Sequence, residues 1–169
     1  MQALFLRLTS TIFRCPNVVM SYLLIIANTP TPNTQRLFQS VIKGAQQTGY
    51  PVVSKSPLEA SAEDILSASG VILGTTEHFG YMSGLIKDLL ERIYYPCMEN
   101  TDGMPWALYV KAGLDGTGAI NSVGKIVSGM RWKAVQEPLL LHGSFTEEFL
   151  GEAEALGAGM AEGLKLGIF

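Results

Sequence analysis

The chain has 169 residues, enough for one domain with a sizeable core and too few for two. Hydrophobic residues make up 47% of it, which favours a packed interior over disorder. The 12 basic and 15 acidic residues give a formal net charge of -3, which suits neither nucleic acid nor an anionic membrane surface as a partner. These numbers point to a small-molecule site.

Cysteine and histidine residues are few and widely spaced. Cys15, Cys97, His78 and His142 form no metal-ligand spacing, so we expect no metal site and no disulfide framework. Unpaired thiols are typical of a reducing compartment, so a cytoplasmic location is predicted. No run of about 20 apolar residues occurs, so no membrane span is expected.

The first 19 residues carry two arginines and no acid. They are interpreted as a loose N-terminal extension, 1–19, with Met20 as the expected start of translation and 20–169 as the domain. A targeting segment is the alternative. Because the first strand is predicted to begin only at Tyr22, the extension is expected to be dispensable for folding.

Strand and helix patterns then alternate along the chain. The apolar run YLLIIA at 22–27 predicts a strand covered on both faces, and a helical pattern follows up to Gly49. The remaining predicted elements are a strand at 51–53, a helix from Ser61, a strand at 71–74, a helix through 85–93, a strand at 106–110, a helix at 119–130, a strand at 135–141 interrupted by Pro138, and a helix at 146–165.

Five such alternations predict an α/β domain, a doubly wound parallel sheet of five strands between two layers of helices. Ligands of such sheets bind beyond the carboxyl ends of the strands. The chemistry is therefore expected in the loops after the strands at 22–27, 71–74 and 106–110. Gly157, Gly159 and Gly163 follow no strand, and we interpret them as residues of helix packing.

The loop after the first strand combines short polar side chains with a helix N-terminus. Such a terminus offers free N–H groups and a positive dipole end, which suit a phosphate monoester. A capped helix without a ligand is the alternative. The expected donors are Thr29, Thr31, Asn33 and Thr34.

The next two loops carry aromatic residues and glycines. The segment from Thr75 to Gly84 exceeds the ~2–6 residues that are common between strand and helix. A planar ligand can stack on Phe79 or Tyr81, and the alternative is that these rings cap the core. The third loop, 112–118, is rich in glycine, which lets backbone approach a flat ligand.

The stretch GTTEHFGYMSGLIKDLLER, from Gly74 to Arg92, resembles the flavin-binding loop and following helix of the flavodoxin-like NAD(P)H-dependent FMN reductases and quinone reductases. The segment 29–34 is similar to the T-x-T-G-N-T phosphate loop of flavodoxins, except that Pro32 replaces the glycine. The resemblance implies a flavodoxin-like fold and an FMN site. The residues implied around the flavin ring are Thr75, Thr76, Glu77, His78, Phe79, Gly80, Ala112, Gly113 and Gly116.

By this resemblance the chain is expected to be an enzyme, an FMN-dependent oxidoreductase. It would take hydride from NADH or NADPH and reduce a small acceptor such as a quinone or a free flavin, with no side chain assigned as acid or base. FMN is expected rather than FAD, because no dinucleotide fingerprint follows the first strand. A homo-oligomer is implied as well. The alternatives are a flavodoxin-type electron carrier and, because of Pro32, a binding module without a flavin.

Overall fold

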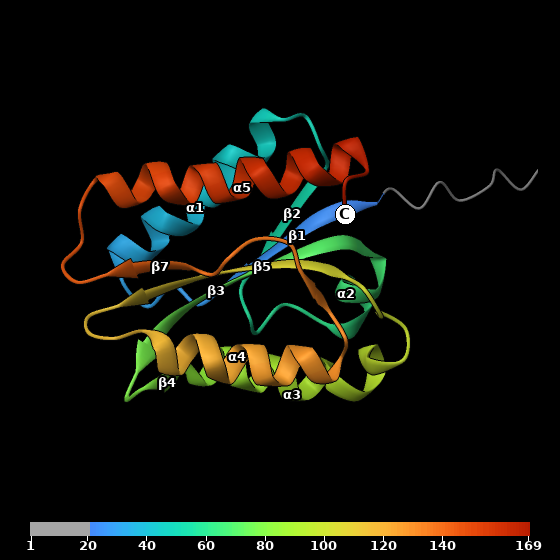
Figure 1. Ribbon diagram of the computed structural model, residues 1–169, viewed down its shortest axis with the longest axis horizontal. Coiled ribbons are helices and arrows are strands. Elements are labelled where there is room, and N and C mark those ends of the chain that lie inside the picture. The colour runs from blue at the N-terminus through green and yellow to red at the C-terminus, as the bar shows by residue number, and fades with distance from the viewer. Residues whose placement is uncertain (1–20) are drawn as a thin grey trace, which may run out of the picture.

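The structure is a computed structural model that describes residues 21–169, so the predicted extension lies outside the described residues. Strands and helices alternate along the described chain, except that β4 follows β3 directly and β7 follows β6 (Figure 1). The elements are β1 (Tyr22–Ala27), α1 (Pro32–Gln47), β2 (Val52–Lys55), α2 (Ala62–Ser67), β3 (Ala68–His78), β4 (Tyr81–Met82), α3 (Gly84–Met98), β5 (Pro105–Ala112), α4 (Thr117–Gly129), β6 (Lys133–Ala134), β7 (Leu139–His142) and α5 (Glu148–Leu166).

The strands form one sheet in the order β2-β1-β3-β5, and β6 and β7 both pair with the outer side of β5. All pairings are parallel except that of β4 with β3. Helices α1 and α5 cover one face, while α2, α3 and α4 cover the other (Figure 1). The predicted doubly wound parallel sheet in three layers is confirmed. Since the strand order reverses between β1 and β3, a crevice for ligands is expected at their carboxyl ends.

The apolar runs of the sequence become strands buried on both faces. Leu24 and Ile26 of β1 pack toward α2–α4, whereas Leu23 and Ile25 pack toward α1 and α5. Successive side chains of a strand point to opposite faces, so only an unbroken apolar run satisfies a sheet with helices on both sides. All four side chains are fully buried.

Glycines allow α1 and α5 to pack closely. A Cβ at Gly44 of α1 would lie 1.9 Å from the Glu154 carbonyl oxygen, and one at Gly157 of α5 would lie 2.0 Å from that of Val41. The packing role predicted for Gly157 is confirmed. Gly163 makes room for the Phe169 ring, and Gly159 lies beside the amide of Gln136.

The long loop predicted at 75–84 is wrong in its conformation. The polar residues after Gly74 continue β3 as far as His78, and the chain turns back through Phe79 and Gly80 into β4. Both turn residues have positive φ, 53° and 70°, which is the conformation of a two-residue hairpin turn whose twist matches the strands. The predicted loop is therefore a β-hairpin.

The single strand predicted at 135–141 is divided into two. Lys133–Ala134 pairs with the start of β5, and Leu139–His142 pairs with its end. Pro138 lies between them and has no N–H to donate to a ladder, so the segment leaves the sheet there.

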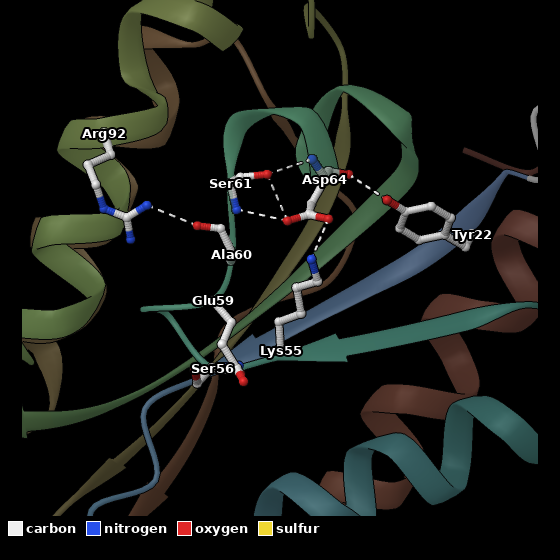
Figure 2. A network of polar contacts seen from close by, with 8 residues as sticks. All are labelled: Tyr22, Lys55, Ser56, Glu59, Ala60, Ser61, Asp64 and Arg92. Carbon is white, nitrogen blue, oxygen red and sulfur yellow. Dashed lines mark hydrogen bonds and ion pairs between the residues drawn. The ribbon is translucent and has the colours of Figure 1, made fainter.

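A polar network fixes the connection from β2 through α2 (Figure 2). Ser61 caps α2, and its N–H donates to the Asp64 carboxylate at 2.8 Å, which forms a capping box at the start of the helix predicted from Ser61. The other Asp64 oxygen accepts from Lys55 Nζ at 2.6 Å. From α3, Arg92 donates to the carbonyl oxygens of Ala60 and Pro57, which holds the preceding loop against that helix.

We expect Asp64→Asn to destabilise the protein at neutral pH by about 1–2 kcal/mol, the range for a lost cap and charged hydrogen bond. Burial raises the pKa of Asp64, but hydrogen bonds from Lys55 and Ser61 outweigh it, so the pKa is lowered on folding. A lowered pKa stabilises the fold above the unfolded value of about 4 and ceases to do so as pH falls through the folded value.

Urea unfolding at pH 7 and pH 3 measures this effect. The difference between wild type and Asp64→Asn should shrink at pH 3. Glu91→Gln is the matched control, because its Lys87 partner makes an exposed pair on one helix that is worth only a few tenths of a kcal/mol. An equal loss at both pH values would contradict the assignment to the carboxylate.

Candidate functional site at the carboxyl ends of the strands

The three loops singled out in the sequence lie at one edge of the sheet and are connected. The Asn28 N–H donates to the Gly74 carbonyl at 3.1 Å, which joins the first loop to the end of β3. The hairpin in turn lies against α4, because a Cβ at Gly118 would be 2.0 Å from the Gly80 carbonyl oxygen. Residues far apart in sequence thus form one continuous rim.

In the first loop, the four expected donors divide into two pairs. Thr31 is the N-cap of α1, and it exchanges hydrogen bonds with the buried Thr34 in a capping box. The side chains of Thr29 and Asn33 make no hydrogen bond within residues 21–169, and neither does the Asn33 N–H. No acidic residue stands in the first turn of α1. Pro32 takes the first helical position, where a missing N–H costs least.

In the hairpin, some predicted residues support the loop and others face outward. Thr75 is buried and bonds to Ser83 across the base of the hairpin, with Ser83 N donating to Thr75 Oγ1 at 3.1 Å. Thr76 Oγ1 lies 2.7 Å from His78 Nε2. At the tip, the Phe79 side chain is fully exposed, beside Gly80.

Glu77 connects the hairpin to α4. Its carboxylate accepts from the Ala119 N–H at 3.3 Å, in the first turn of that helix. A carboxylate at a helix N-terminus satisfies a free N–H and interacts favourably with the helix dipole. A second contact, from Met82 N to Ser122 Oγ at 3.2 Å, holds the returning strand to the same helix.

In the third loop, Ala112 is buried and Gly113 is exposed. Gly116 is the N-cap of α4 with φ 77°, and a Cβ there would be 2.2 Å from Leu140 Cδ1. Backbone conformation and packing therefore both require this glycine. Leu114, between them, is 81% exposed.

A tyrosine from β5 lies beneath this edge. The Tyr109 ring fills the place that a side chain at Gly74 would occupy, since a Cβ there would be 2.2 Å from the ring. Within the described residues the buried hydroxyl has no hydrogen-bond partner, and burial raises the pKa of this phenol.

Comparison with known proteins supports the fold. No family model and no curated protein matches the chain. Among solved structures, a flavodoxin from the domain Archaea is 17% identical with a TM-score of 0.76, over 85% of this chain and 99% of that one. Oxidised flavodoxin 2 from Bacillus cereus is 19% identical with a TM-score of 0.69, over 84% and 99%. The chain has the flavodoxin-like fold.

Larger proteins contain this flavodoxin-like unit as well. The flavodiiron core of a Synechocystis sp. protein is 19% identical with a TM-score of 0.73, over 89% of this chain. The match covers 37% of that protein, so the chain spans about a third of its length. No helix within residues 21–169 is long and apolar enough to cross a membrane.

Sequence reasoning missed two residues of this flavodoxin-like edge. Leu114 was passed over within a glycine-rich turn, although a large apolar side chain in such a turn is itself a signal. Lys111 falls between the strand predicted at 106–110 and the loop predicted at 112–118, and the structure places it in β5. A surface hollow of about 610 Å³ lies between α3 and α4 and is also lined by Tyr81 of the hairpin, and a second of about 370 Å³ lies between β7 and α5.

Proposed function

We propose that the chain is an FMN-dependent oxidoreductase that accepts hydride from NADH or NADPH and reduces a small acceptor such as a quinone or a free flavin. The observation that carries this proposal is the continuous rim at the strand-order reversal. There the N-terminus of α1, which has no acidic residue in its first turn, lies next to the hairpin, and the tip of the hairpin exposes the Phe79 ring. A phosphate monoester and a planar ring are both parts of FMN, where a ribityl chain joins them.

The N-terminus of α1 fits the phosphate. The Asn33 N–H and the hydroxyl of Thr29 are unengaged within the described chain, and the helix dipole favours a dianion. The hydroxyls of Thr31 and Thr34 bond to one another, so they would have to exchange partners to join in. Pro32 leaves the helix start intact, since its position has no intrahelical hydrogen bond to lose, but it offers the phosphate one N–H donor fewer.

The hairpin and the third loop fit the ring. Phe79 and Leu114 are exposed apolar side chains from two loops that are held together through Glu77 and α4. Flat contact with a ring would bury both. The polar edge of the ring would meet backbone of the hairpin and of Gly113. FMN, when bound, supplies the hydride and electron chemistry, and the chain supplies binding and orientation.

An electron carrier is the second candidate. The flavodoxins from the domain Archaea and from Bacillus cereus are matched over nearly their whole length, which favours this function. Hydride transfer requires donor and acceptor atoms at about 3–3.5 Å, so a reductase must keep one ring face open to the nicotinamide. A carrier can cover both faces.

Titration of the purified chain with FMN and with FAD tests cofactor choice, and we expect tighter binding of FMN. Anaerobic stopped-flow mixing of the FMN-loaded protein with NADH and with NADPH then tests the activity. Bleaching of the flavin absorbance within seconds is expected. If FMN binds and neither nucleotide reduces it, the carrier is the correct function. If no flavin binds, the chain is a binding module of another kind.

We also propose, from the same resemblance, that the chain forms a homo-oligomer. Sedimentation velocity of the purified protein measures its mass. A single species at the 18.3 kDa of one chain would contradict this proposal.

A further inference from the structure

Lys111 carries a positive charge at the carboxyl ends of the strands, and no acidic side chain of the described residues forms an ion pair with it. Its Nζ donates to the carbonyl oxygens of Ala112 at 3.0 Å and of Gly143 at 2.5 Å. The same atom lies 5.7 Å from the centre of the Phe149 ring. No carboxylate oxygen comes within 4.0 Å of it in the described part of the chain.

The other basic residues of the described chain differ from it. Seven of them form ion pairs with carboxylates. Lys125 and Lys133 have no such partner but are exposed, so water solvates them. Lys111 is partly buried, and this burial lowers its pKa. Taking an ammonium group out of water is unfavourable unless a nearby group compensates. The two carbonyl dipoles and the Phe149 ring offset part of the cost of burying the ammonium group, but they do not neutralise its positive charge.

In strand register and in sequence, the backbone of Lys111 lies between the two loops proposed to hold the flavin ring. Thr76 of the hairpin is its partner in the β3–β5 register. Ala112 and Gly113 of the third loop follow it directly. The contacts of its Nζ fix the ammonium group at the end of β5, beside the turn that leads from β7 to α5.

We propose that Lys111 raises the reduction potential of the bound flavin by stabilising its negatively charged reduced form. This inference rests on the proposed function. A hydride taken from NADH or NADPH leaves the oxidised nicotinamide and adds one negative charge to the flavin ring. A fixed positive charge in a partly dehydrated position interacts more favourably with that anion than with the neutral oxidised ring. Lys111 thus favours transfer toward the flavin without touching the nicotinamide.

A purely structural role would give a different signature. The ammonium group also joins Ala112 to Gly143, but the Gly143 N–H already donates to the Ala112 carbonyl at 2.9 Å. Loss of a purely structural hydrogen bond weakens the binding of oxidised and reduced flavin equally, so the reduction potential of the flavin does not change. Loss of charge weakens the binding of the reduced form selectively. The potential therefore separates the two roles.

The experiment compares Lys111→Gln with wild type, both loaded with FMN. Glutamine keeps an N–H donor for the two carbonyls and removes the charge. Lys111→Met is a second neutral variant in case the first does not fold, and Lys111→Arg keeps the charge. The matched control is Lys133→Gln, which removes the same charge at β6, beside the opposite end of β5. The midpoint potential is measured by spectroelectrochemistry, and the affinity for oxidised FMN by fluorescence titration.

We expect the neutral variants to bind reduced FMN at least tenfold more weakly relative to oxidised FMN. For a two-electron couple this corresponds to a fall in potential of about 30 mV. Lys111→Arg and Lys133→Gln should stay near wild type. An unchanged midpoint potential in an FMN-loaded neutral variant overturns the role of Lys111. An equal fall of the potential in Lys111→Arg overturns it as well. Neither result contradicts the proposed function. If wild type binds no FMN at all, both are wrong.

Discussion

Gly157→Ala is expected to destabilise the protein by about 3 kcal/mol, at the upper end of what overpacking costs. The added methyl group would lie 2.0 Å from the Val41 carbonyl oxygen, which belongs to the backbone of α1 and cannot rotate away. The two helices would have to separate along their whole contact. Both are packed on β1 and β5 in one core cluster, so that separation also loosens the sheet face below.

Urea unfolding measures this loss, and Gly151→Ala in the same helix is its matched control. Nothing lies within 4 Å of a Cβ at Gly151. There the higher helix propensity of alanine should stabilise the protein by about 0.5–1 kcal/mol. The same substitution, glycine to alanine, is therefore expected to lower the free energy of unfolding at position 157 and to raise it at position 151. Equal effects would show that α1 and α5 are not in close contact.

Gly118→Ala is expected to weaken FMN binding at least tenfold while the domain stays folded. Its methyl group would lie 2.0 Å from the Gly80 carbonyl oxygen and 2.6 Å from the carbon of that carbonyl. The hairpin must then move away from α4, which also lengthens the contact between Glu77 and the Ala119 N–H. The two surfaces proposed to enclose the flavin ring would no longer keep their spacing.

Gly124→Ala is the control for this prediction, because it lies in α4 as well and meets nothing within 4 Å. It should bind FMN as wild type does. Fluorescence titration gives the affinities, and circular dichroism shows whether each variant is folded. Wild-type affinity in Gly118→Ala would mean that the hairpin and α4 do not form the flavin site together.

The sequence predicted the fold well because its strongest signals are local. The apolar runs of β1 and β3 and the capping box of α2 depend only on neighbouring residues. The hairpin was missed for a physical reason. Thr75 and Thr76 are polar and suggested a loop, yet pairing with Val110 and Lys111 extends the strand through them. In addition, Phe79 adopts a positive φ, a backbone conformation that is more typical of glycine or asparagine.

The individual roles at the candidate site were less predictable, because they depend on contacts between distant segments. The donors Thr31 and Thr34 suit a phosphate and a helix cap equally well, and only the structure shows them bonded to each other. Glu77 accepts a hydrogen bond from Ala119 of α4, which lies 42 residues further along the chain. Whether Lys111 has a counter-ion likewise depends on which carboxylates the fold brings near it, and no local pattern reports that.

The divided outer strand also affects how copies of the chain meet at high concentration. A long exposed strand offers a row of unpaired N–H and C=O groups onto which another chain can add. Here one border of the sheet is β2, with four residues, and the other consists of two pieces of two and four residues separated by Pro138. Within residues 21–169 neither border offers a long continuous template, so edge-to-edge polymerisation into β-aggregates is disfavoured even though the core strands are strongly apolar.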